Sequence, residues 1–442
     1  MRLPSPLTGA LFALFSLPLL AAADPALTVT ADNPTGIAAP GQKIVWHVAV
    51  SDDPEHKIQN GTYVLKKGGA EVIGQGKLTF GAEPATVETS LNGPGTVLAE
   101  FDAPVEGKKP LQAFAGAAVE PGKLRPSLPA PADFDAFWKA KIAELTAVPE
   151  NAVLEKSDSG KEGIDYWKIT MDNIRGTHIH GQVARPAAGE KHPALLIVQW
   201  AGVYPLPKTF VTDRAQEGWL VLNILAHDLP IDNPKEFYDE QGKNALKDYT
   251  SIGNEDRETS YFLRMFLSCY RAAEYLSKRP DWDGKTLIVS GGSQGGLQSF
   301  VTAALNPKIT AVLANVPAGC DNTGAEAGRN PGWPYWKNHT QGRDAKKVME
   351  TSRYFDAMNF AARIHCPTLV GMGLIDVTSP ASGVFSAFNQ IKAPKEIVVI
   401  PNSPHQNVNG VQGPFYKREG EWRAALVKGQ PAPVQPNTAV AP

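Results

Sequence analysis

The sequence predicts a mostly parallel β-sheet covered by helices on both faces, preceded by a small all-β domain. In the larger, second part of the chain, continuous apolar runs such as "ALLIVQW", "GWLVLNIL", "TLIVSG" and "PTLVGMG" alternate with helical segments. This alternation is typical of buried parallel strands joined by helical crossovers. From Ala26 to about Ala118, short β-type runs are broken by Gly, Pro, Asn and Asp, which indicates an antiparallel β-sandwich.

The chain begins with the layout of a secretory signal peptide. Arg2 precedes an apolar run that ends in the small residues Ala21-Ala22-Ala23, a pattern typical of a cleaved leader. A membrane anchor is the alternative, but the run is at or below the ~17–25 residues that span a bilayer. We therefore expect residues 1–23 to be removed near Ala23. The mature chain is expected to be secreted or periplasmic, without an integral membrane segment.

Composition argues against several classes of partner and site. The 442 residues are 43% hydrophobic and 20% charged, with a net charge of −2. These values suit a soluble globular protein and predict no nucleic-acid partner. The three cysteines are too few for a disulfide framework and include no C-x-x-C pair for zinc. One bridge, between Cys269 and Cys320, stays open as an alternative.

The β-sandwich is assigned to residues 24–118, and the proline-rich stretch "EPGKLRPSLPAPADF" marks its boundary. Its role is either that of a spacer or that of a carbohydrate- or partner-binding module. The α/β domain, residues 119–428, opens with a helix whose apolar stripe should pack on that domain. The stripe consists of Phe134, Phe137, Trp138, Ile142 and Leu145. The proline-rich tail, residues 429–442, is expected to be disordered.

The stretch "TLIVSGGSQGGLQSF" places Ser293 between two pairs of glycines. Gly291, Ser293 and Gly295 fit G-x-S-x-G, the nucleophile elbow of α/β-hydrolases, in which a sharp strand-to-helix turn exposes the serine above the sheet. Small neighbours are needed there because larger side chains would collide with the adjoining strand or helix. The apolar run before Ser293 and the helical pattern after it supply the context that the motif requires.

Chain order supplies the other two members of a catalytic triad. In α/β-hydrolases the acid follows the serine and the histidine follows the acid. Asp376 follows the apolar run "PTLVGMG", and His405, the only histidine after it, follows "EIVVIP". Taken singly, Asp376 can be a helix N-cap and His405 a surface loop residue. Together with Ser293 they predict a nucleophile, a general base and an acid that orients the base.

The oxyanion of the tetrahedral intermediate needs two pre-aimed backbone donors. One should be the N–H of Gln294, directly after the nucleophile, and the other should come from the loop after an earlier strand. The loop in "VQWAGVYPL" fits, because Gly202 lets it pass close to the site. We therefore predict Val203, or alternatively Tyr204, as the second donor.

Beyond these motifs, the segments "PADFDAFWKAKIAEL", "SGGSQGG" and "SRYFDAMNFAARIHCPTLVGMGLIDVTSPASGVFSAFNQIKAPKEIVVIPNSPH" resemble one known family. It is the acetylxylan esterase and cephalosporin C deacetylase family, carbohydrate esterase family seven. The resemblance spans roughly residues 120–425 and implies Ser293, Asp376 and His405 as the triad, with Gln294 and Val203 as oxyanion donors. It further implies hydrolysis of small acyl esters, chiefly acetyl, on sugar hydroxyls, without a metal or another cofactor.

The sequence departs from the family pattern at three places. "LAHDLPID", around His227, stands where the family has Arg-Gly-Gln. The family's His-Gly-Tyr is here Ala201-Gly202-Val203, with Tyr204 one place later, and only Pro380 is left of the prolines after the acid. The first departure concerns the family's loop packing and hexameric assembly. A homo-oligomer is therefore left as an open expectation.

Aromatic residues are the candidates for substrate contacts. The segment "NPGWPYWKNHTQ" carries Trp333, Tyr335 and Trp336, whose faces can stack on sugar rings, as can that of Tyr204. The alternative is that the three aromatics in this segment anchor a long loop to the body of the protein.

Several polar residues near strand ends have open roles. His178 and His180 face the same side of a strand, but no third ligand is nearby in the sequence, so no metal site is predicted. His227 and Asp228 follow the end of a strand, and we expect them to form hydrogen bonds within a loop.

These patterns predict a secreted serine esterase that removes acetyl groups from carbohydrates. A prolyl-oligopeptidase-type peptidase shares the G-x-S-x-G-G motif and the chain order. Such peptidases usually carry a β-propeller of several ~40–50-residue blades, for which the N-terminal region is too short. A non-catalytic carbohydrate-binding protein is the third alternative, which the presence of all three triad residues disfavours.

Overall fold

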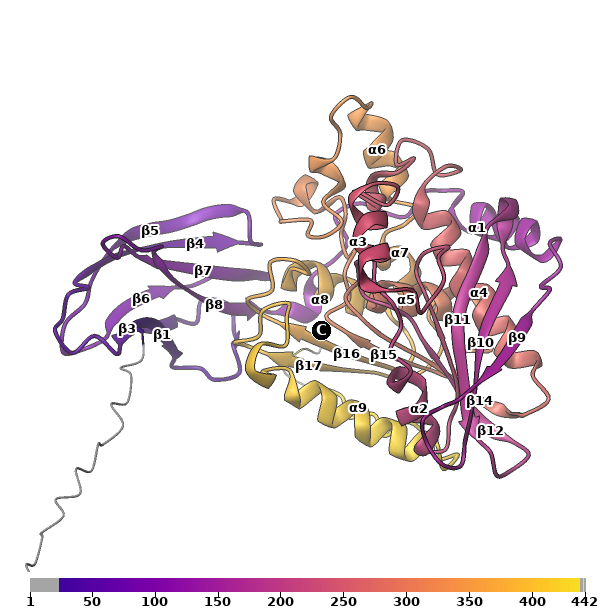
Figure 1. The fold of residues 1–442 in the computed structure, drawn as a ribbon. Helices are drawn as coiled ribbons and strands as arrows, with labels where there is room; N and C mark the ends of the chain where they lie inside the picture. Colours follow the sequence, from indigo (N-terminus) through magenta and orange to yellow (C-terminus); the bar gives the residue numbers. More distant parts are fainter. Residues whose placement is uncertain (1–23, 438–439, 441–442) are drawn as a thin grey trace, which may run out of the picture.

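The computed structural model describes residues 24–437 and residue 440. It shows a β domain beside a larger α/β body (Figure 1). The predicted signal peptide lies outside the described residues, as do residues 438–439 and 441–442 of the predicted tail. None of the described helices combines the length and the hydropathy of a bilayer-spanning segment.

The β domain consists of two sheets that share one core. One sheet has the order β1 (Ala26–Ala31), β3 (Ile44–Ser51), β6 (Ala85–Thr89). The other has the order β2 (Ile37–Ala38), β8 (Leu111–Val119), β7 (Gly95–Ala103), β4 (Asn60–Lys67), β5 (Glu71–Thr79). Alternate residues of β3, Trp46 and Val48 among them, pack against Val97 and Phe101 of β7 in this core, as the period of two in a half-buried strand requires.

Within the described residues, the α/β body contains a nine-stranded sheet. Its strand order is β17-β16-β15-β14-β12-β13-β11-β10-β9. The strands from β12 to β17 are parallel, and β9 to β11 form an antiparallel edge. The prediction of a mostly parallel sheet is therefore confirmed. The strands are β9 (Val153–Ser157), β10 (Ile164–Asp172), β11 (His178–Pro186), β12 (His192–Ile197), β13 (Leu220–Ile224), β14 (Trp282–Gly292), β15 (Ala311–Asn315), β16 (Thr368–Gly373) and β17 (Lys395–Ile400).

Helices cover both faces of this sheet (Figure 1). One face packs on α1 (Phe134–Thr146), α4 (Tyr261–Lys278), α5 (Gln294–Leu305), α7 (Ala357–Ala361) and α8 (Ala381–Gln390). The other packs on α2 (Thr209–Gln216) and α9 (Gly413–Leu426). In β14, Leu287 and Val289 point to the first set and Ile288 points to the second. Both faces are thus buried, which explains the continuous apolar runs. Helices α3 (Lys235–Lys243) and α6 (Ala345–Ser352) lie in the connections after β13 and β15.

Helix α1 buries the face that the sequence predicts. Phe134, Phe137, Trp138 and Leu145 are at most 5% exposed, and Ile142 packs partly against them. The indole N–H of Trp138 donates to the carbonyl of Tyr354 at 3.2 Å. The three cysteines are buried and free, so Cys269 and Cys320 form no bridge.

The chain before α1 and after α9 is tied to the α/β body. In the proline-rich junction, the carbonyls of Pro121 and Leu124 accept hydrogen bonds from the side chain of Asn389 at 2.8 and 3.0 Å. Beyond α9, Val434 packs on the core under that helix, and the N–H of Gln435 donates to a carboxylate oxygen of the sheet at 2.7 Å. Residues 432–437, which the sequence predicts to be disordered, thus make apolar contacts and hydrogen bonds with the α/β body.

Candidate active site

Ser293 occupies a strained turn between β14 and α5, with φ 58° and ψ −121°, a conformation that residues other than glycine rarely adopt. A Cβ atom at Gly291 would lie 2.6 Å from the backbone of Gly295. A Cβ atom at Gly295 would lie 2.5 Å from the carbonyl oxygen of Val198, which follows β12. Glycine at both positions therefore allows the strand, the helix and the neighbouring loop to approach closely enough to form the turn.

The structure brings Ser293, His405 and Asp376 into one hydrogen-bonded chain. His405 Nε2 lies 2.8 Å from Ser293 Oγ, and His405 Nδ1 lies 2.8 Å from Asp376 Oδ2. Asp376 follows β16 and His405 follows β17. Because parallel strands end at the same edge of a sheet, three residues distant in sequence meet above it.

The carboxylate of Asp376 is fixed from two sides. Its second oxygen, Oδ1, accepts the N–H groups of Thr378 and Ser379 at 2.8 and 2.7 Å. The side chain is fully buried, so solvent does not compete for these bonds. A carboxylate held in this way accepts the Nδ1–H of His405 and leaves Nε2 facing the serine. The N-cap alternative does not apply, because Pro380 precedes α8.

Two side-chain amides join the loop of His405 to the elbow. Gln412 donates to the carbonyl of His405 at 3.0 Å and accepts from Asn315 Nδ2 at 2.7 Å. The carbonyl of Asn315, at the end of β15, accepts the N–H of Ser293 at 2.9 Å. No sequence pattern points to Gln412 or Asn315, because a single amide side chain carries no motif.

The two predicted oxyanion donors lie on connected segments. Gln294 is the first residue of α5, so its backbone N–H has no partner within the helix. Within the described chain, the N–H of Val203 also has no hydrogen-bond acceptor. The side chain of Gln294 donates to the carbonyl of Gln199 at 3.3 Å, which ties the start of α5 to the loop that carries Val203. Both N–H groups are therefore available to a ligand.

Buried aromatic side chains hold this loop in place. His227 Nε2 donates to the carbonyl of Gly202 at 2.9 Å, and Nδ1 accepts from the hydroxyl of Tyr261 at 2.7 Å. Burial lowers the pKa of His227 to about 4, so the ring is neutral near pH 7, with one donor and one acceptor. The hydroxyl of Tyr249 donates to Gln294 Oε1 at 2.5 Å. The loop hydrogen bond expected of His227 is confirmed, whereas Tyr249 was missed for lack of any local pattern.

The aromatic residues predicted to contact substrate have mostly structural contacts. Trp336 is 2% exposed and donates its indole N–H to the carbonyl of Thr250 at 2.7 Å. The ring of Trp333, partly buried, lies 5.8 Å from that of Phe262. The prediction of a sugar contact is therefore wrong for Trp336, which lies inside the core. For this residue and Trp333, the alternative role as loop anchors fits these contacts.

Tyr335 and Tyr204 also bond to nearby backbone. The hydroxyl of Tyr335 donates to the carbonyl of Val377, next to Asp376, at 3.2 Å. The hydroxyl of Tyr204 donates to the carbonyl of Trp200 at 2.8 Å, and the two rings stack with their centroids 5.2 Å apart. The side chain of Tyr204 therefore packs within its own loop, against the ring of Trp200.

A cavity of about 420 Å³ opens beside the elbow. Its lining includes the backbone of Gly291 and Gly292 and the rings of Trp200, Phe210 and Tyr416. Trp200 and Tyr416 are each 46% exposed. Asp213, Arg214, Glu419 and Arg423 also line this cavity, whereas Ser293 and His405 do not. The sequence did not single out these residues, because they lie in unrelated segments.

The elbow and the sheet order define an α/β-hydrolase. Residues 120–419 match the family model of acetyl xylan esterase (AXE1). The chain is also 34% identical over 312 residues to the acetyl esterase Axe7A of Xylanibacter ruminicola, a match that covers 68% of this chain and 69% of that protein. The protein therefore belongs to the acetyl xylan esterase family and is a carboxylic ester hydrolase of the carbohydrate esterase type.

Solved structures share the fold. Acetyl xylan esterase 1 from Thermoanaerobacterium sp. JW/SL YS485 superposes with a TM-score of 0.60 at 23% identity, over 70% of this chain and 98% of that one. The acetyl xylan esterase from Paenibacillus sp. R4 gives 0.59 at 24% identity, with the same two coverages. The β domain, up to Val119, precedes the segment matched by the family model.

Proposed function

We propose that the protein removes acetyl groups from carbohydrate hydroxyls by a Ser-His-Asp, acyl-enzyme mechanism. One observation carries the proposal: in a member of an esterase family, Ser293, His405 and Asp376 form a continuous hydrogen-bonded chain at the carboxyl edge of the sheet. Two well-formed hydrogen bonds in this order are the arrangement that activates a serine.

In the first half of the reaction, Ser293 Oγ attacks the carbonyl carbon of the ester while His405 Nε2 accepts the hydroxyl proton. The intermediate then collapses, the bond to the sugar oxygen breaks, and His405 gives its proton to the departing alcohol. The acetyl group stays on Ser293. Water repeats the sequence and releases acetate. Asp376 stabilises the imidazolium in both halves.

The N–H groups of Gln294 and Val203 are proposed to stabilise the negative charge on the carbonyl oxygen. Such donors are effective when they do not have to reorganise during the reaction. The hydrogen bonds from His227 to Gly202 and from Gln294 to Gln199 support a rigid arrangement.

The proposed substrate is an acetylated polysaccharide, because the relatives are named as acetyl and acetyl xylan esterases. Trp200, and with it Tyr416, offers an exposed ring beside the elbow for a sugar unit. Export of the enzyme is proposed from the leader-like residues 1–23, and it would bring the protein to such a polymer.

Acetate release from p-nitrophenyl acetate and from acetylated xylan tests the proposal. Ser293→Ala should reduce kcat by about 10⁴-fold or more. Ser299→Ala, which removes another hydroxyl from the same helix, is the matched control and should retain activity. Full activity of Ser293→Ala would overturn the mechanism. Activity on the small ester with none on acetylated glycans would overturn only the substrate.

A further inference from the structure

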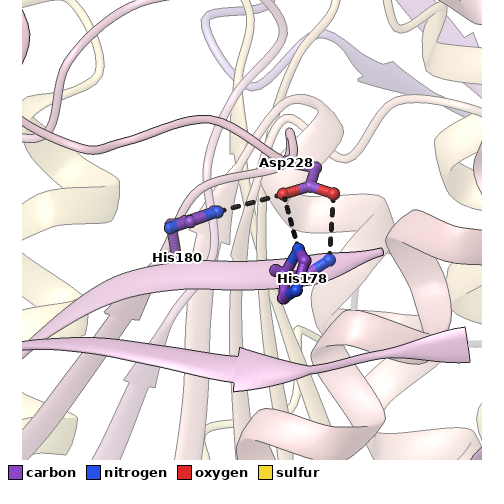
Figure 2. Close-up of side chains that lie close together, drawn as sticks. All are labelled: His178, His180 and Asp228. Atoms are coloured by element: carbon purple, nitrogen blue, oxygen red, sulfur yellow. Dashed lines mark hydrogen bonds and ion pairs between the residues drawn. The ribbon is translucent and has the colours of Figure 1, made fainter. Parts of the chain in front are cut away.

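His178, His180 and Asp228 converge at a second place on the carboxyl edge of the sheet (Figure 2). Each offers one ligand atom, and these atoms all lie within 4.8 Å of one another. The sequence supplies the histidine pair but not the third residue. The fold supplies it, because β11 pairs antiparallel with β13, so that the start of β11 lies beside the chain that leaves β13.

The spacing of the three ligand atoms fits a single ion. His180 Nε2 lies 3.0 Å and His178 Nδ1 lies 3.7 Å from the same oxygen, Asp228 Oδ1. Ligands bound at ~2.1 Å around a tetrahedral ion are about 3.4 Å apart, between these two values. The contact of 3.7 Å is too long for a hydrogen bond. The ring of His178 therefore faces the carboxylate without bonding to it.

The surroundings favour ligation. Asp228 Oδ2 accepts the backbone N–H of His178 at 2.9 Å, which orients the carboxylate. On the far side of the His178 ring, Nε2 lies 3.9 Å from Asp172 Oδ1, so neither ring nitrogen of His178 is held in a hydrogen bond by a carboxylate. The side chains of His178 and Asp228 are 49% and 32% exposed, so an ion and a water can enter.

We propose that His178, His180 and Asp228 bind a divalent transition-metal ion of the zinc class, with water in the fourth position. Two imidazoles and one carboxylate suit Zn²⁺ or Co²⁺, whereas Ca²⁺ and Mg²⁺ prefer oxygen ligands alone.

The site is separate from the triad, because β13 and β12 lie between β11 and β14, about 14 Å at ordinary strand spacing. The ion joins the start of β11 to the loop after β13. The residue before Asp228 in that loop, His227, holds the carbonyl of Gly202. The proposed role of the ion is therefore to stabilise this edge of the sheet and not to take part in ester hydrolysis.

The test uses the full chain without a histidine tag, stripped with EDTA and titrated with ZnCl₂ in a calorimeter. One equivalent of Zn²⁺ is expected to bind, and the Tm is expected to rise with Zn²⁺ concentration. Titration with CoCl₂ should give the visible absorption of four-coordinate Co²⁺. No binding of either ion by the folded wild type would overturn the proposal.

Variants locate the binding. His178→Ala and His180→Ala should each weaken Zn²⁺ binding at least about tenfold. His47→Ala is the matched control: His47 is also on a strand and pairs with Asp32 at 2.8 Å, but it belongs to no three-ligand cluster among the described residues. It should bind Zn²⁺ like the wild type. His178 is at an exposed strand start, so its variant should fold even if that of His180 does not. Unchanged Zn²⁺ affinity in a folded His178→Ala would overturn the proposal.

Discussion

Leu374 packs so closely against Gly116 that a Cβ atom at position 116 would lie 2.6 Å from the Cβ of Leu374. Gly116 belongs to β8 of the N-terminal domain, and Leu374 follows β16 directly, two residues before Asp376. The β domain therefore packs directly against the loop that carries Asp376, the acid of the proposed triad. A substitution in the β domain that displaces Leu374 is expected to change kcat.

Gly116→Ala should lower kcat for p-nitrophenyl acetate about tenfold with little change in KM. The added methyl pushes Leu374 away, and small displacements of an orienting group are costly to the chemical step. Gly93→Ala is the control in the same domain, since a Cβ there meets nothing within 4 Å. Equal kcat values for the two variants would show that the domains are not coupled in this way.

Asp376→Asn should reduce kcat by about 10⁴-fold, because the amide favours the wrong tautomer of His405. KM should change little. Asp344→Asn is a suitable comparison: Asp344 also accepts two backbone N–H groups, at the start of α6, but has no part in the proposed chemistry. Steady-state kinetics measures kcat and KM for both variants. A loss of kcat of less than tenfold in Asp376→Asn would contradict the proposal that Asp376 orients His405.

His227→Leu should reduce kcat by about 10–100-fold, because the carbonyl of Gly202 loses its donor and the oxyanion loop is free to shift. Tyr261→Phe keeps the His227 ring and removes the hydroxyl that bonds to His227 Nδ1 and to Arg264, so its effect should be smaller. Single-turnover measurement of acetyl transfer to Ser293 separates this effect from substrate binding. A larger loss of kcat in Tyr261→Phe than in His227→Leu would show that His227 does not position the loop of Gly202 and Val203.

Two tryptophans should behave in opposite ways. Trp200→Ala removes an exposed ring and should raise KM for acetylated xylan, with little change in activity on p-nitrophenyl acetate or in Tm. Trp336→Ala removes a core side chain and should lower the free energy of unfolding by about 3–5 kcal/mol. Thermal unfolding and the two assays together test both statements. An equal loss of stability in Trp200→Ala and Trp336→Ala would contradict the interpretation of Trp200 as an exposed ring and Trp336 as a core side chain.

Asp356 should make stability depend on pH. Burial, followed by the charge of Asp321, raises its pKa from 3.8 to about 7. Between these values the folded chain holds a proton that the unfolded chain has lost, so the free energy of unfolding falls as pH rises through this window.

Urea unfolding at pH 5 and pH 8 measures this effect. The decrease in the free energy of unfolding from pH 5 to pH 8 should be larger in the wild type than in Asp356→Asn, by on the order of 2 kcal/mol. An identical decrease in both proteins would show that folding does not raise the pKa of Asp356.

Much of the α/β body could be predicted because strands buried on both faces leave continuous apolar runs in the sequence. Strands β5 and β8 have no clear strand pattern in the sequence. The first is interrupted by Gly74 and Gly76, and the second is rich in alanine and glycine, both poor strand formers. Their pairing is set by the sheet around them, through contacts that local pattern does not contain.

The three residues of the proposed triad can be identified from the sequence because the elbow has a motif and its partners follow in a fixed order. The residues around it cannot. Gln412 and Tyr249 make their contacts through the packing of distant strands and loops, and nothing in their own segments marks them. Trp336 shows the converse, since an aromatic cluster in the sequence is compatible with both a binding surface and a core.

The two bonds from Asn389 to the carbonyls of Pro121 and Leu124 have a consequence for how a polymer would reach the enzyme. A junction held by these bonds restricts rotation of the β domain against the α/β body. If the proposed glycan substrate contacts both domains, we therefore expect it to lie across them at a fixed distance from Ser293.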